Sequence, residues 1–215
     1  MNEKAAFFDL DDTILETYSG KLYYSYLLKT NQISFKYFMK LLPLPFLFIM
    51  GIMDIESITR KLSERFIGMT YDEVIKMGND WYENNGRQYV RNFIKEIIES
   101  HKKDGFKIIM LSASPWSICY PVFKDLEMDD LVCSELIFEN NIFVRMADDY
   151  CYGQKKADMA VDYSKKHDID LKKSYFYTDS HSDLPFLKKV GNPICVTPDK
   201  KLKKVALENN WKILD

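Results

Sequence analysis

Two aspartate motifs stand near opposite ends of the 215-residue chain. Each follows a short apolar run typical of a buried strand in a parallel sheet; the first carries Asp9 and Asp11, the second Asp179 and Asp183. Ligands of open α/β sheets bind beyond the carboxyl ends of such strands, so neighbouring strands would bring the four carboxylates together. Crowded carboxylates repel one another unless a cation lies among them, and hard oxygen ligands suit Mg²⁺. The spacing therefore predicts metal-assisted chemistry in one crevice.

Two further elements occur between these motifs in the chain. The apolar run at residues 107–111 leads into Ser112, which would place a hydroxyl at the end of another buried strand. Residues 153–156 open a helical stretch with Lys155 and Lys156 at its start. Together with the aspartates, these groups supply a nucleophile, an acid or base, a hydroxyl donor and a cation for a phosphate.

This ordered set resembles the motifs of the haloacid dehalogenase (HAD) superfamily, and most closely its subfamily IB of phosphoserine-phosphatase-like hydrolases. The first motif, Asp9-Leu10-Asp11-Asp12-Thr13, matches the family pattern DxDx[TV], and Ser112 ends the second. Lys156 or Lys155 matches the third, and residues 178–183 match the DSxxD form of the fourth. The resemblance covers residues 4–15 and about 90–215, including a tail that reaches Trp211.

The resemblance implies a phosphatase that works through an aspartyl-phosphate. Asp9 is then the nucleophile, since an aspartate can form an acyl-phosphate and divide a difficult step into two. Asp11 is the general acid for the leaving oxygen and then the base for water, a double role that a raised pKa in a crowded acidic site would suit. We expect Mg²⁺ to be held by Asp9, by the backbone carbonyl of Asp11 and by Asp179, because it offsets the repulsion between nucleophile and phosphate.

Four further residues receive supporting roles. Ser112 and Lys156 are expected to bind the phosphate oxygens that are not transferred. The Gly-x-x-Lys spacing of the subfamily favours Lys156 over Lys155, and only one of the two can point inward. Asp183 is expected to fix Lys156 or a metal-bound water, and Thr13 to hold the first loop by hydrogen bonding.

Strands and helices alternate along most of the chain, which predicts a Rossmann-like, doubly wound, mostly parallel α/β sheet. The expected strands are residues 5–9, 106–111, 131–134, 174–178 and 194–196, with a hairpin at 136–144. The expected helices are residues 89–103, a helix after Pro115 for which Ser114 would be the cap, 156–166 and 200–209.

About 70 mostly helical residues interrupt this alternation after the first strand. We predict a helical cap domain at residues 16–88, inserted in a core domain made of residues 1–15 and 89–215. In the family such an insert covers the active site, where it would exclude water and hold the part of the substrate that does not react. Arg60 and Arg65 in the cap could meet a carboxylate or a second phosphate, but solvated helix arginines are the commoner case.

The stretch at residues 41–53 is unusually apolar. It is too short to cross a bilayer, and Pro43 and Pro45 interrupt any helix. The favoured interpretation is buried packing, in which case Phe46 and Phe48 would stabilise the protein. The less favoured interpretation is a greasy substrate pocket or contact with a membrane surface.

Composition excludes some classes of protein. A net charge of −2 does not indicate a protein that binds nucleic acid. The histidines His101 and His167 lie among lysines and are expected to be exposed, and His181 is not favoured as a functional group.

No signal peptide is expected, because residues 2–4 lead straight into the first strand, and a cytoplasmic location is predicted. The cysteines lack CxxC spacing and are expected to be buried free thiols: Cys119, Cys133, Cys151 and Cys195.

The predicted activity is Mg²⁺-dependent hydrolysis of a small phosphomonoester. The alternatives are a lipid-phosphate phosphatase with an apolar cap pocket and a phosphotransferase of the same fold. Asp11 favours hydrolysis, since family members without it tend to lose that activity. Phosphoserine is doubtful, because Tyr18 stands where the family's glutamate for the substrate amine is typical and residues 112–115 depart from its Ser-Gly-Gly form. Oligomeric state is left open.

Overall fold

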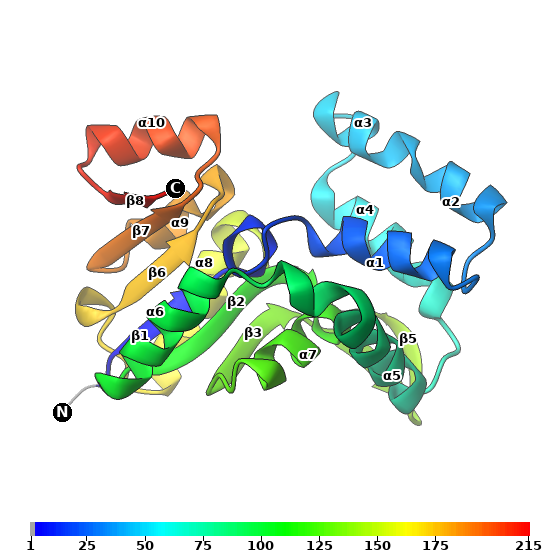
Figure 1. The fold of residues 1–215 in the computed structure, drawn as a ribbon, viewed down its shortest axis with the longest axis horizontal. Coiled ribbons are helices and arrows are strands. Elements are labelled where there is room, and N and C mark those ends of the chain that lie inside the picture. Colours follow the sequence, from blue (N-terminus) through cyan, green and yellow to red (C-terminus); the bar gives the residue numbers. More distant parts are fainter. Residues whose placement is uncertain (1–2) are drawn as a thin grey trace.

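Six parallel strands form the centre of the molecule (Figure 1). Their order across the sheet is β3-β2-β1-β6-β7-β8, and every neighbouring pair is parallel. The strands are β1 (Ala5–Phe8), β2 (Lys107–Pro115), β3 (Asp130–Ser134), β6 (Tyr175–Thr178), β7 (Asn192–Val196) and β8 (Lys212–Leu214). The structure is a computed structural model that describes residues 3–215, apart from the side chains of Pro45, Phe48 and Ile49.

Helices cover both faces of this sheet. Successive side chains of a strand point to opposite faces, so Phe8 packs in one apolar cluster with α6 and α7, while Phe7 packs in another with α8, α9 and α10. These helices are α6 (Asn92–Lys103), α7 (Trp116–Asp125), α8 (Gly153–Lys166), α9 (Leu184–Leu187) and α10 (Lys200–Glu208). The predicted doubly wound, Rossmann-like α/β fold is confirmed.

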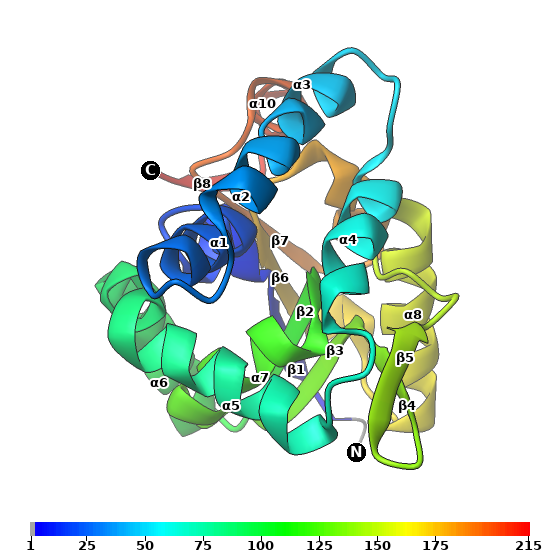
Figure 2. The same ribbon diagram turned by 90° about the vertical axis from the view of Figure 1, so that its right-hand side faces the viewer.

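Five helices occupy the segment that follows β1, as Figure 2 shows from the side. They are α1 (Ser19–Lys29), α2 (Phe35–Leu41), α3 (Pro43–Ile49), α4 (Ile55–Ser63) and α5 (Tyr71–Trp81). The start of α5 is specified by a capping box: the Thr70 side chain accepts from the Glu73 N–H at 3.2 Å, and Glu73 in turn accepts from the Thr70 N–H at 2.8 Å. The helical insertion is therefore confirmed, while the exact limits of the two domains remain a prediction.

A β-hairpin joins the helical segment to the core. Strands β4 (Leu136–Glu139) and β5 (Ile142–Met146) form a separate antiparallel pair, which confirms the predicted hairpin. The Phe143 N–H donates to the Met69 carbonyl at 2.8 Å, and the Gly68 N–H donates to the Phe143 carbonyl at 3.0 Å. On the other side, Gly78 lets α5 approach α7 closely, since a Cβ there would stand 2.1 Å from the Ser117 oxygen.

The apolar stretch at residues 41–53 is exposed over much of its length, and the packing interpretation is wrong for Phe46. Phe46 is 61% exposed and Met50 57% exposed, whereas Leu44 is buried. The side chain of Phe48 lies outside the described residues. Pro43 does not prevent a helix here, because it is the first residue of α3. At this position the backbone N–H has no hydrogen-bond partner within the helix, so its absence in proline does not destabilise the helix. In the described part of the chain, no helix has the length and apolar character needed to cross a membrane.

The largest differences from the expected strands concern β2 and β8. Strand β2 continues to Pro115, four residues beyond its predicted end, so that Ser112 lies within it. Strand β8 (Lys212–Leu214), which pairs with β7 at the edge of the sheet, was not predicted.

Candidate active site

Three adjacent strands carry predicted site residues to one edge of the sheet. Asp9 follows β1 directly, and its N–H donates to the Tyr177 carbonyl of β6 at 2.9 Å. Asp179 is the first residue after β6, and Ser112 lies in β2 on the other side of β1. All three side chains are buried. The convergence of the strand ends that the sequence predicted is thus present.

The Lys156 ammonium group lies between two carboxylates. Its Nζ donates to Asp9 Oδ1 at 3.0 Å and to Asp183 Oδ2 at 2.7 Å, and the side chain is 3% exposed. Lys155 points away and pairs with Asp149 at 2.6 Å with half of its side chain exposed. Burial alone would lower the pKa of Lys156, but Asp183 and Asp9 outweigh it and raise that pKa. The structure therefore places Lys156 inside the site and Lys155 outside it.

Asp183 holds Lys156 from the side opposite Asp9. Its Oδ2 also accepts from the Thr178 hydroxyl at 2.7 Å, so two short hydrogen bonds fix this oxygen. Its Oδ1 is buried and has no partner among residues 3–215. A buried acceptor without a donor is costly, which indicates that this oxygen serves a group such as a water in the working enzyme.

The aspartates at the strand ends are hard to ionise together. Burial is the largest influence on the pKa of Asp9. Together with the negative charges of Asp183 and Asp11, it outweighs the opposing effect of the Lys156 charge and raises this pKa to about 7. Burial, followed by the charge of Asp9, raises the pKa of Asp179 to about 8. Unneutralised negative charge of this kind is what a bound cation would offset.

The residues present fit a magnesium ion. Asp9 and Asp179 offer hard carboxylate oxygens, the Asp11 carbonyl a third ligand, and the orphaned Asp183 oxygen a partner for a metal-bound water. Within the described residues no three His, Cys, Asp or Glu side chains stand ready as a ligand set. The ligand set predicted from the sequence, two carboxylates and a main-chain oxygen, would be small, as is typical of magnesium sites that also use waters and substrate phosphate.

Asp11 is turned toward the helical segment. Its carboxylate accepts from the Ser19 N–H at the start of α1, and from the Ser114 hydroxyl at 2.8 Å. The hydroxyls of Ser19 and Ser114 are themselves 3.0 Å apart. The expectation that Ser114 caps the next helix is wrong: Pro115 is the cap residue of α7, and the Ser114 side chain contacts Asp11. Sequence reasoning missed Ser19, and the Ser-x-Ser spacing at Ser112 and Ser114 was the available signal for Ser114.

The loop after β1 is held differently from the prediction. Thr13 was expected to hydrogen-bond, but its hydroxyl is buried without a partner among the described residues. The loop is fixed through the carbonyl of Asp12, which accepts from the Thr197 hydroxyl at 3.3 Å and from the Arg91 guanidinium at 3.4 Å. Asp12 has a φ of 49°, a left-handed conformation that aspartate adopts more readily than most residues other than glycine. Arg91 and Thr197 had no motif to mark them.

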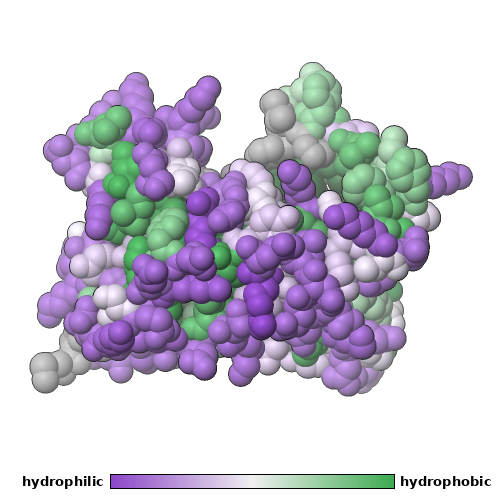
Figure 3. Space-filling model, in the orientation of Figure 1, coloured by the Kyte–Doolittle hydropathy of each residue, from purple (hydrophilic) through white to green (hydrophobic). Residues whose placement is uncertain are grey.

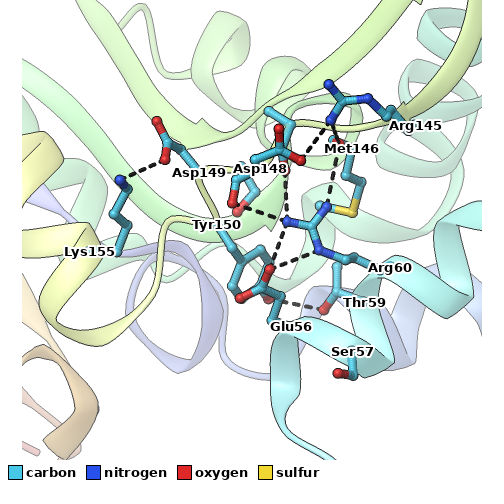
Figure 4. Close-up of polar contacts among 12 residues, drawn as sticks. Glu56, Ser57, Thr59, Arg60, Arg145, Met146, Asp148, Asp149, Tyr150 and Lys155 are labelled. Atoms are coloured by element: carbon cyan, nitrogen blue, oxygen red, sulfur yellow. Dashed lines mark hydrogen bonds and ion pairs between the residues drawn. The ribbon is translucent and has the colours of Figure 1, made fainter.

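Arg60 is part of a clamp rather than a free cation (Figure 4). Its guanidinium donates to Glu56 at 2.8 Å and to the carbonyls of Ala147 at 2.8 Å and Asp148 at 3.2 Å. Beside it, the hydroxyls of Thr59 and Tyr150 are 3.0 Å apart. These contacts tie α4 to the loop that leads into α8, so Arg60 indirectly helps to position Lys156.

One expected surface histidine is internal. His101 was predicted to be exposed, but it is buried on α6 and its Nε2 lies 2.8 Å from the Tyr177 hydroxyl. Burial lowers the pKa of His101. His181 contributes its backbone N–H to Asp199 at 2.7 Å. The four cysteines are buried and free, as predicted: Cys119, Cys133, Cys151 and Cys195.

The pKa shifts predict how the stability of the metal-free protein depends on pH. Because Asp9 and Asp179 ionise less readily in the folded chain than near the ordinary value of 3.8, the folded state binds more protons than the unfolded state between about pH 4 and pH 8. The free energy of unfolding in EDTA should therefore fall as the pH rises through this window, by at most about 1.4 kcal/mol per pH unit for each carboxyl.

Urea unfolding at a series of pH values measures this dependence, and Asp179→Asn should flatten it. Added Mg²⁺ should restore stability mainly at the upper end of the window, because metal binding requires the ionised carboxylates. A metal-free protein whose stability rises from pH 4 to pH 8 would contradict this account.

Comparisons with known proteins agree with this geometry. The chain is 27% identical, over 98% of its length and 74% of the relative, to a probable phosphatase of Mycobacterium tuberculosis (strain ATCC 25618 / H37Rv). It superposes at a TM-score of 0.90, with 18% identity, on a Bordetella pertussis Tohama I protein of unknown function, covering 100% of this chain and 99% of that one.

A phosphoserine phosphatase carrying an analogue of its phospho-aspartyl intermediate has the same fold at a TM-score of 0.71, with 15% identity and coverage of 100% and 93%. The expected resemblance to phosphoserine-phosphatase-like proteins is thus confirmed at the level of the fold. The sequence model of the haloacid dehalogenase-like hydrolases matches residues 6–188. The chain belongs to the haloacid dehalogenase-like hydrolase family.

Proposed function

We propose that this protein is a Mg²⁺-dependent phosphatase that hydrolyses a small phosphomonoester through an aspartyl-phosphate on Asp9. The observation that carries the proposal is the buried arrangement in which Lys156 lies between Asp9 and Asp183 beside Asp179. Ligands of open α/β sheets bind beyond the carboxyl ends of the strands, and Asp9 and Asp179 directly follow the ends of β1 and β6. The named phosphatases among the similar proteins support the same reaction class.

Asp9 is the group that attacks. Lys156 holds its Oδ1, so that the other carboxylate oxygen is free to bond to the phosphorus as the bond to the leaving oxygen breaks. Bound Mg²⁺ would neutralise charge between this carboxylate and the phosphate. In this proposal the Lys156 ammonium and the Ser112 hydroxyl stabilise the oxygens that stay on phosphorus.

Asp11 moves the protons in this proposal. Protonated Asp11 gives its proton to the leaving oxygen, and ionised Asp11 then takes one from the water that attacks the phosphorus of the aspartyl-phosphate. Its carboxylate now bonds to Ser19 and Ser114, so it must exchange these partners for the substrate. Because Ser19 opens α1, binding of a substrate under the helical segment would be coupled to the release of the acid.

The substrate side of the site argues against phosphoserine. No glutamate stands at position 18; the residue is Tyr18, which is 60% exposed at the start of α1. Arg60 is already bonded to Glu56 and main-chain carbonyls and offers no free cation for a substrate carboxylate. A small phosphorylated metabolite without a zwitterionic amino-acid group fits these residues better.

Metal removal tests the proposal. Turnover of an aryl phosphate should vanish in EDTA and return with Mg²⁺, because the charge on Asp9 otherwise repels the phosphate. Asp179→Ala should weaken that rescue sharply, and Ca²⁺ should inhibit, since its larger size and looser coordination misplace the nucleophile. Full activity after exhaustive chelation would contradict the proposed site.

A further inference from the structure

Helices α2 and α3 expose a continuous apolar stripe. Its members follow one another at intervals of four, three, four and four residues, which places them on one side of a helical path. They are between 46% and 67% exposed and form what we call the outer stripe: Phe35, Met39, Leu42, Phe46 and Met50. Figure 3 shows hydrophobic side chains gathered over this part of the right-hand lobe.

The opposite side of the same helices already has its partners. Tyr37 and Leu41 pack against the apolar cluster that includes residues of α1, and Leu44 is buried. The helical path therefore does not need the outer stripe for folding. A surface helix ordinarily turns polar residues toward water, and a contiguous apolar patch on the outside indicates a binding surface.

The charged side chains along residues 17–53, which include the stripe, are all positive. Residues 17–53 contain four lysines and no aspartate or glutamate, although the whole chain has a net charge of −2. Lys36 and Lys40 each follow a stripe residue directly, so they flank the stripe, and Lys21 and Lys29 lie on α1. None of the four forms an ion pair within the described part of the chain.

We propose that the outer stripe docks on an anionic lipid surface, with α2 and α3 lying in the plane of the interface. Helices that bind in this way combine a large apolar face with lysines that reach the headgroups. Phosphatidylglycerol or another anionic lipid would complement Lys36 and Lys40, while the stripe enters the boundary between headgroups and acyl chains.

A second copy of the chain fits the stripe less well. The path from Phe35 to Ile49 is about 22 Å long at 1.5 Å per residue, so the stripe offers a partner a single helix face. A stable protein interface needs about 800 Å² from each partner. Docking on a membrane does not require a minimum contact area of this kind. In a symmetric dimer, moreover, the lysines of the two copies would face one another and repel.

Vesicle flotation with the full chain tests the proposal. The protein should float with vesicles of phosphatidylcholine and phosphatidylglycerol and much less with phosphatidylcholine alone, and added salt should weaken binding. Phe35→Ser combined with Phe46→Ser should reduce binding at least about tenfold. Lys36→Glu combined with Lys40→Glu should reduce it by about fivefold or more per lysine.

Matched controls separate the stripe from general effects. Leu207→Ser removes an apolar side chain that is 66% exposed on α10, and Lys188→Glu with Lys189→Glu makes the same change of charge elsewhere. Both controls should bind vesicles like the unaltered protein, and all variants should keep its melting temperature and phosphatase activity in solution.

Three results would overturn the proposal. The first is an unaltered protein that stays away from anionic vesicles. The second is equal loss of binding in the stripe variants and the controls. The third is a protein that sediments as a dimer, does not float, and becomes monomeric on Phe46→Ser, since the stripe would then be occupied by a second copy. Because the readout is binding, these outcomes are independent of whether the proposed phosphatase chemistry is correct.

Discussion

Replacing Asp9 by Asn is expected to reduce turnover of an aryl phosphate by roughly 10⁴-fold or more while the protein stays folded. An amide cannot form the acyl-phosphate, so the two-step route is lost. The fold should tolerate the change, because the Asn oxygen can still accept from Lys156 and because Asp183 still supplies that ammonium with a charged partner. Burial already disfavours the charged form of Asp9, as its raised pKa shows, so a neutral residue is not foreign to this position.

Two measurements check this result. Steady-state kinetics give the loss of turnover, and a thermal melt establishes that the variant is folded. Beryllofluoride trapping followed by mass spectrometry or crystallography should place the adduct on Asp9 in the unaltered protein and give none in the variant. Substantial Mg²⁺-dependent turnover by a folded and sequence-verified Asp9→Asn preparation would rule out the covalent mechanism.

Lys156→Met is expected to lower both stability and activity, whereas Lys155→Met should change neither by much. Removing the ammonium leaves Asp9 and Asp183 buried without their shared counter-charge, and breaking a buried ion pair in this way typically costs 3–5 kcal/mol. Activity falls as well, because a positive group for the phosphate oxygens is lost. The pair Lys155–Asp149 is largely exposed, so its loss should cost about 1 kcal/mol or less.

The two lysines make a matched comparison, since they are neighbours on one helix and undergo the same substitution. Urea unfolding gives the free energy for each variant, and turnover is measured below the temperature at which the weaker variant unfolds. Equal losses of stability and turnover from the two substitutions would mean that the inward position of Lys156 does not matter for function. A folded Lys156→Met protein with normal turnover would contradict its proposed role at the phosphate.

The sheet was predictable from the sequence because buried parallel strands are nearly continuous apolar runs. The strands that lead to Asp9, Ser112 and Asp179 have this character, and a polar residue follows each apolar run. Strand β8 (Lys212–Leu214) escaped because three residues at the edge of a sheet, with a lysine among them, give no such run. The helical character of residues 16–88 was predictable as well. The sequence did not reveal which side of these helices would pack against the rest of the protein.

The errors share a physical cause, which is that contacts between distant residues decided them. Phe46 was taken to be buried because its neighbours are apolar, yet another face of the same helices meets the core. His101 was taken to be exposed because lysines follow it, although its spacing from Ile94 and Ile98 puts it on the inner face of α6. Ser114 contacts Asp11 across 103 positions of sequence, a distance at which local patterns carry no signal.

The central place of β1 in the sheet has a consequence for how the chain is made. Its neighbours arrive late in synthesis: Ala5 pairs with Lys107 and Ala6 pairs with Tyr175. The strand that leads to Asp9 is therefore made well before either partner strand, and both of its edges stay unpaired until the chain has reached β2. Meanwhile the helices α1–α5, whose contacts are more local, have time to form. We expect a nascent chain in which Asp9 is made long before Ser112, Lys156 and Asp179 can join it, and in which the unpaired strand needs protection from other chains.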